Sequence, residues 1–133
     1  MAGFLLDTNH LSEAIRPVSR VRDRIGQLHV SGVRVGTCVP VLCELEAALP
    51  SSNRAEAYRR ALQRLLGRVR LWPLERSIAR AYGEVFKELR GRGRVLSQVD
   101  MILAALARQK ALTLATRDRD FEALPDLRTE NWL

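Results

Sequence analysis

Short runs of apolar residues, set between longer segments with helical periodicity, are the feature that most constrains the fold of this chain. The first run, Gly3–Leu6, has the pattern of a strand buried on both faces. Four further short strands are predicted, at residues 33–36, 69–74, 112–115 and 127–129. The strand at 69–74 contains Pro73, which cannot donate a ladder hydrogen bond, so we expect it at an edge of the sheet.

The segments between the strands predict helices. They lie at residues 8–16, 18–29, 37–49, 54–66, 75–89 and 97–110, with a short turn or helix at 118–124. Strands that alternate with helices predict an α/β fold with a mainly parallel central sheet flanked by helices on both faces. A length of 133 residues predicts a single domain, residues 1–133.

Composition excludes several other classes of protein. With 47% hydrophobic and 28% charged residues, the chain has ordinary globular usage rather than that of a disordered protein. The apolar run Met1–Leu6 is too short, and lacks a basic start, for a signal peptide or a membrane span. The cysteines, Cys38 and Cys43, make neither a disulfide framework nor a zinc site. We therefore expect a cytoplasmic protein with no membrane partner.

Positive charge is concentrated in one part of the sequence. Residues 54–94 carry twelve basic and four acidic residues, a charge of +8, whereas the whole chain carries +7. All the basic residues except Lys87 and Lys110 are arginines, whose planar fork suits phosphate. A nucleic-acid backbone is therefore one expected partner. A solvated helix face is the other interpretation, and charge alone does not choose between the two.

Acidic residues follow two of the predicted strands. Asp7 comes directly after the first strand, and Asp118 lies just past the strand at 112–115. Since ligands of parallel sheets bind beyond the carboxyl ends of the strands, both aspartates would face one site if those strands are neighbours. For each residue alone, a helix N-cap is the better explanation of the position.

Two helices supply further acidic residues. Asp100 precedes seven consecutive apolar residues, 101–107. A charge at the start of a buried helix needs a partner or a cation. The alternative interpretation is a capping box with Ser97. On the helix at 37–49, Glu44 and Glu46 flank the apolar arc on opposite sides. Helical periodicity does not choose between these two glutamates.

Convergence of these carboxylates would have a chemical consequence. Close pairs repel by about 4 kcal/mol each at an effective dielectric of 20, so a cluster needs a cation, protonation or basic neighbours. Oxygen ligands alone select a hard cation such as Mg²⁺ or Mn²⁺. Mg²⁺ held by carboxylates beside a basic surface suits hydrolysis of phosphodiester bonds.

Four motifs in order resemble the PIN-domain ribonucleases, and most closely the VapC-like toxins of type II toxin–antitoxin systems. The resemblance covers the whole chain and ends at Asn131-Trp132. The four motifs are Leu5-Leu6-Asp7-Thr8-Asn9, Val41-Leu42-Cys43-Glu44-Leu45, Asp100 with the apolar run 101–107, and Thr116-Arg117-Asp118-Arg119-Asp120-Phe121. Two residues depart from the family pattern. His10 replaces an aliphatic residue, which we interpret as a tolerated surface change rather than a catalytic base, and Ala48 replaces a glycine.

The resemblance implies roles for individual residues. It selects Glu44 over Glu46 and implies a catalytic quartet of Asp7, Glu44, Asp100 and Asp118. Asp7, Asp100 and Asp118 would hold Mg²⁺, with Mn²⁺ as a possible substitute, and Glu44 would orient or deprotonate the attacking water. Asn9, Thr116 and Asp120 would be supporting residues, with Asp120 either assisting Asp118 or substituting for it.

The resemblance also implies a function and partners. The predicted function is a Mg²⁺-dependent endoribonuclease, the toxin of a VapBC-type system, with RNA as substrate, a VapB-like antitoxin as partner, and a homodimer as assembly. The alternative is a non-catalytic basic domain that binds RNA or a protein partner through its arginines. A doubly wound phosphatase is disfavoured, since that chemistry would want an aspartate at position 9, where this chain has Asn9.

Overall fold

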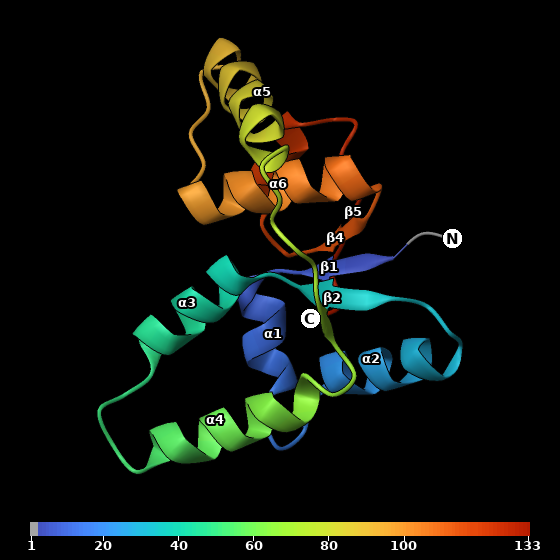
Figure 1. Cartoon of the computed structure of the whole chain (residues 1–133), viewed down its shortest axis with the longest axis vertical. Helices are drawn as coiled ribbons and strands as arrows, with labels where there is room; N and C mark the ends of the chain where they lie inside the picture. Colours follow the sequence, from blue (N-terminus) through green and yellow to red (C-terminus); the bar gives the residue numbers. More distant parts are fainter. Residues whose placement is uncertain (1–2) are drawn as a thin grey trace.

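The computed structural model describes residues 3–133, so Met1 and Ala2, which open the first apolar run, lie outside the described residues. Strands and helices alternate along the chain (Figure 1). The strands are β1 (Phe4–Leu6), β2 (Val35–Thr37), β3 (Arg70–Leu71), β4 (Thr113–Ala115) and β5 (Thr129–Glu130). The helices are α1 (Thr8–Ala14), α2 (Arg20–Val30), α3 (Val39–Ala48), α4 (Arg54–Leu65), α5 (Ile78–Gly91), α6 (Gln98–Lys110) and the 3₁₀ helix η1 (Arg119–Ala123).

The five strands form one sheet in the order β3-β2-β1-β4-β5, and every recorded pair is parallel. β1 lies at the centre, pairing with β2 on one side and with β4 on the other, where Leu6 is in register with Ala115. β3 forms one edge, as the proline predicted. Because parallel strands end at the same edge, the residues that follow β1, β2 and β4 come together there.

Helices lie on both sides of the strands: α5 and α6 on one side, and α1, α2 and α4 on the other (Figure 1). The predicted α/β fold with a parallel central sheet is therefore confirmed. The apolar run in α6 is buried almost all round, because the helix is covered both by the sheet and by α5. Within residues 3–133, no helix is long and apolar enough to cross a membrane.

The structure corrects one prediction about side-chain burial. The helical spacing of Ala57, Ala61 and Leu65 predicts that this face of α4 packs against the core, but Ala57 is exposed and Ala61 only partly buried. The helix contacts the core near its two ends, because α4 buries only Ala55 near its start and Leu65 near its end. The middle of its apolar face is left open to a groove.

Candidate active site

Asp7 and Asp118 meet at the carboxyl edge of the central strands. Asp7 follows β1, is 5% exposed, and its backbone N–H donates to the carbonyl of Ala115 on β4 at 3.1 Å. Asp118 lies three residues beyond the end of that strand and is partly buried. The pairing of β1 with β4, which the sequence left as a condition, is what brings the two aspartates to one edge.

Both aspartates are also helix N-caps, as the alternative interpretation expected. The carboxylate of Asp7 accepts from the backbone N–H of His10 at 2.8 Å, and that of Asp118 accepts from the N–H of Asp120 at 2.8 Å. Thr116 is buried, and its hydroxyl accepts from the N–H of Asp118 at 3.1 Å. Capping therefore fixes the direction of each carboxylate without removing it from the site.

Asp100 lies in the first turn of α6, where the hydroxyl of Ser97 accepts a hydrogen bond from the backbone N–H of Asp100 at 3.1 Å. Its pKa is raised above the ordinary value, first by burial and then by the negative charges of Asp118, Glu44 and Asp7, while Ser97 opposes the shift. These three carboxylates are thus close enough to repel Asp100. The other three acidic residues of the predicted quartet therefore act electrostatically on Asp100.

Glu44 and Glu46 take different directions from α3. The Glu44 carboxylate accepts a hydrogen bond from the hydroxyl of Thr8, beside Asp7. The Glu46 carboxylate accepts instead from the Nε of Arg59 on α4 at 2.9 Å, and this contact lowers the pKa of Glu46. The structure therefore brings Glu44 to the acidic cluster and holds Glu46 away from it.

The remaining predicted residues lie farther out. The exposed carboxylate of Asp120 forms an ion pair with Arg94 at 3.2 Å, while the backbone N–H of Asp120 donates to the capping carboxylate of Asp118. Asn9 is exposed on the first turn of α1, and its supporting role stays a prediction. Thr8 belongs to the first motif, but no role was predicted for it. Its position directly after Asp7 is the signal that could have identified it as a partner of the acidic residues.

The expectation that His10 lies on the surface is wrong. Its side chain is fully buried, and its ring Nδ1 lies 2.9 Å from Oδ1 of Asp7. The other ring nitrogen, Nε2, accepts from the backbone N–H of Trp132 at 3.0 Å. The C-terminal residues cover this side of α1. Helical periodicity could not predict this contact, because it joins positions 122 residues apart.

Comparison with known proteins identifies the fold. The sequence profile of the PIN domain matches residues 4–127. The chain belongs to the PIN domain family. This PIN domain is 30% identical over 139 residues to Ribonuclease VapC2 of Haemophilus influenzae, with all of both chains covered. It is also 30% identical to the tRNA(fMet)-specific endonuclease VapC of Shigella flexneri, with 99% of each covered.

A solved structure agrees with the sequence relatives. The PIN domain is similar to a chain of VapBC2 from Rickettsia felis, crystallised bound to a promoter DNA fragment. The TM-score is 0.87, with 25% identity and 98% of each chain covered. The predicted resemblance to VapC-like PIN domains and the predicted enzyme class, a nuclease, are confirmed.

The acidic cluster of this PIN domain suits a divalent cation in its chemistry. Its donors are carboxylate oxygens, and like charges disfavour ionisation of Asp100, which a bound cation would reverse. Within residues 3–133, no three His, Cys, Asp or Glu side chains are grouped tightly enough to enclose a metal ion. Mg²⁺ keeps several water molecules and uses one or two carboxylates, so an open group of this kind fits it better than a closed cage would.

Proposed function

We propose that this chain is a Mg²⁺-dependent endoribonuclease and the toxin of a VapBC-type toxin–antitoxin system. The proposal is supported by the positions of Asp7 and Asp118 at one edge of a PIN-domain sheet, and by the Thr8 hydroxyl, which links Glu44 to the residue after Asp7. Burial and the charges of Asp118, Glu44 and Asp7 raise the pKa of Asp100, which is consistent with that arrangement. A nearby arginine-rich segment supplies positive charge for an RNA backbone. The names of the curated relatives support RNA as the substrate class.

Each acidic residue has a proposed task. Asp7, Asp100 and Asp118 would hold Mg²⁺, directly or through water. When bound, Mg²⁺ supplies charge to polarise the phosphodiester and to stabilise the departing oxygen. Glu44, oriented by the Thr8 hydroxyl, would position the attacking water and accept its proton.

The supporting residues act on the backbone around these carboxylates. The Thr116 hydroxyl accepts from the backbone N–H of Asp118. The backbone N–H of Asp120 donates to the Asp118 carboxylate, and the Asp120 carboxylate pairs with Arg94. Asn9, exposed beside Asp7, is proposed to contact the substrate side of the site. Mn²⁺ is expected to replace Mg²⁺, since both are hard cations that favour oxygen ligands.

RNA cleavage tests this function directly. We would incubate 5′-labelled tRNA(fMet), the substrate class named for the Shigella flexneri relative, with the full chain and either Mg²⁺ or a chelator. Internal cuts that require Mg²⁺, and that are lost in folded Asp7→Asn and Asp100→Asn proteins, are expected. Cleavage by both variants at the wild-type rate, or in chelator, would contradict it. RNA binding without cleavage, indifferent to both substitutions, would favour a non-catalytic RNA-binding domain.

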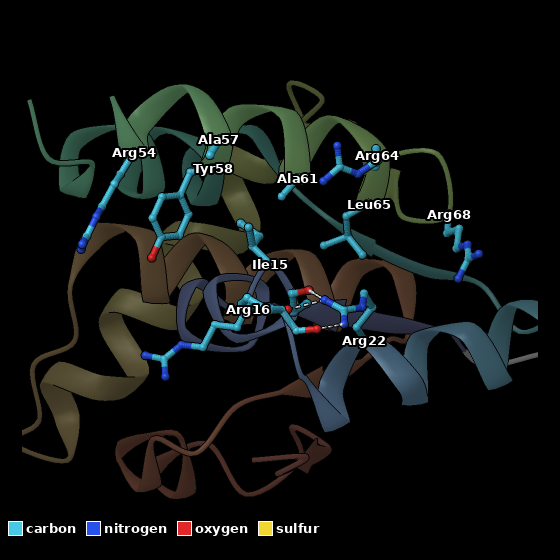
Figure 2. A pocket seen from close by; sticks show the side chains of 12 residues that line it. Ile15, Arg16, Arg22, Arg54, Ala57, Tyr58, Ala61, Arg64, Leu65 and Arg68 are labelled. Atoms are coloured by element: carbon cyan, nitrogen blue, oxygen red, sulfur yellow. Dashed lines mark hydrogen bonds between the residues drawn. The ribbon is translucent and has the colours of Figure 1, made fainter. Parts of the chain in front are cut away.

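An open groove at the far end of α1 from Asp7 is proposed to receive the antitoxin. It lies between the α1–α2 connection and α4, with a volume of about 760 Å³ (Figure 2). Its apolar lining includes Ile15, Ala57, Ala61 and Leu65. Within the described chain, no acidic residue lines the groove. The apolar floor is surrounded by five arginines: Arg16, Arg22, Arg54, Arg64 and Arg68.

The groove fits an amphipathic segment that carries carboxylates. The guanidinium of Arg22 is held by backbone carbonyls, including that of Pro17 at 2.6 Å, so the other arginines form the accessible rim. A second hollow of about 200 Å³ shares Ile15, Arg54 and Tyr58 with the groove and extends along α3 to Leu45 and Glu46. The homodimer that the resemblance implies stays a prediction, which sedimentation equilibrium will test.

A further inference from the structure

The imidazole of His10 lies between a catalytic carboxylate and the C-terminal residues of the chain. It is 0% exposed, and both ring nitrogens have partners: Asp7 Oδ1 at 2.9 Å from Nδ1 and the backbone N–H of Trp132 at 3.0 Å from Nε2. A buried histidine with both nitrogens satisfied has a defined orientation.

The partners also define which nitrogen carries the proton. A backbone N–H only donates, so Nε2 must accept and be unprotonated. Nδ1 then carries the hydrogen of the neutral ring and donates it to Asp7. The amide of Trp132 thus selects the tautomer that presents an N–H to the carboxylate.

This arrangement places two donors on one oxygen of Asp7. Oδ1 accepts from the backbone N–H of His10 at 2.8 Å and from the ring of the same residue at 2.9 Å. A carboxylate held by two donors on Oδ1 has lost its freedom to rotate, and its other oxygen is the one free to act as a ligand.

The C-terminal residues hold the ring in place. The Trp132 indole packs edge-on against Phe4, with ring centroids 5.1 Å apart, and against His10 at 6.1 Å. The guanidinium of Arg24 lies over the same indole, 5.5 Å from its centroid. The backbone amide that fixes the His10 tautomer is therefore anchored on β1 and α2, not on a loose terminus.

We propose that His10 is a positioning residue that orients Asp7 for the divalent cation, through the Nδ1–H tautomer selected by the amide of Trp132. This inference rests on the proposed metal-dependent function and adds a residue to it. A histidine that only filled the core would need volume and satisfied nitrogens, but it would not need to donate to Asp7. A shorter side chain that still donates to Asp7 could replace His10 in the positioning role, but it could not replace the volume of the ring in a core-filling role.

Metal affinity of the full chain separates the two roles. We would measure Mn²⁺ binding by calorimetry for the wild type, His10→Asn, His10→Leu and the control His29→Leu, which alters an exposed histidine. An asparagine amide nitrogen lies near the position of Nδ1, so His10→Asn should stay within about threefold of wild type. His10→Leu should bind about 10–100-fold more weakly, the usual effect of losing a partner of a ligand. His29→Leu should not change the affinity.

A spectroscopic measurement on the wild type does not depend on the folding of any variant. ¹⁵N-edited NMR of the two imidazoles should find His10 neutral with its proton on Nδ1, and His29 provides the reference signal. A proton on Nε2 of His10, or wild-type Mn²⁺ affinity in folded His10→Leu, would overturn the inference and leave the proposed function intact. Absence of Mn²⁺ binding by the wild type would instead remove the metal from the proposed function.

Discussion

The hydroxyl of Thr8 donates a hydrogen bond to the carboxylate of Glu44, which lies 36 residues away on another helix. Thr8 is the first residue of α1, directly after Asp7, and Glu44 lies in the middle of α3. One side chain therefore connects the element that carries a proposed metal ligand with the element that carries the proposed base. We infer that this contact helps to hold Glu44 near Asp7.

Replacing Thr8 should reduce cleavage without unfolding the protein. Thr8→Val keeps the shape of the side chain but removes the donor, and a hydrogen bond to a charged group contributes about 1.5–3 kcal/mol. We expect the single-turnover rate of RNA cleavage to fall about 10–100-fold, whereas Thr8→Ser, which keeps the hydroxyl, should stay near wild type. Equal rates for Thr8→Val and wild type would mean that Glu44 does not need this donor.

The two glutamates of α3 offer a matched comparison. Glu44→Gln removes the proposed base and should lower the cleavage rate by about 10²-fold or more. Glu46→Gln removes only an exposed ion pair with Arg59, so cleavage should stay near wild type and the melting temperature should change little. Cleavage rates of the two variants, measured on the same labelled RNA, show which glutamate is the base. If Glu46→Gln is the inactive variant, the assignment of the base is wrong.

Asp100→Asn should stabilise the protein in the absence of metal. Burial and the charges of Asp118, Glu44 and Asp7 raise the pKa of Asp100, so folding disfavours its ionised form. This cost is present at neutral pH and disappears below the ordinary pKa of 3.8, where Asp100 is protonated in both the folded and the unfolded state. We expect the melting temperature at pH 7 in chelator to rise by roughly 2–4 °C.

Added Mg²⁺ should reverse the order of these two proteins. A ligand that binds only the folded state raises its stability, so millimolar Mg²⁺ should raise the melting temperature of the wild type but not that of Asp100→Asn. Calorimetric scans with Mg²⁺ and with chelator give both comparisons. An equal rise in both proteins would place the cation away from Asp100.

Asp7 and Asp118 illustrate what the sequence could predict. Each follows a short apolar strand, and parallel strands end at one edge, so a shared site required only that the two strands be neighbours. The resemblance supplied that condition, and the pairing of Leu6 with Ala115 fulfils it. The capping of α6 by Ser97 was likewise predicted from local sequence, because capping involves residues only three positions apart.

Glu44 and His10 illustrate what local sequence could not supply. The choice between Glu44 and Glu46 depends on Arg59, which lies on a different helix, whereas helical periodicity describes one helix at a time. The burial of His10 depends on Trp132, a partner 122 residues away. Both facts are set by tertiary packing, so they became visible only when the elements were placed in space.

The groove between the α1–α2 connection and α4 gives the last prediction. Ala57 is exposed on the apolar floor among arginines, so Ala57→Glu should leave the fold intact but place a carboxylate where an acidic partner binds (Figure 2). Like charges at an interface weaken binding, and we expect at least a tenfold loss of affinity for the proposed VapB-like antitoxin. Ala79→Glu, the same change at an exposed position of α5, is the control. Calorimetry with the purified antitoxin should find Ala79→Glu unchanged, and RNA cleavage should be unaffected in both variants. Wild-type affinity in Ala57→Glu would place the antitoxin on another surface.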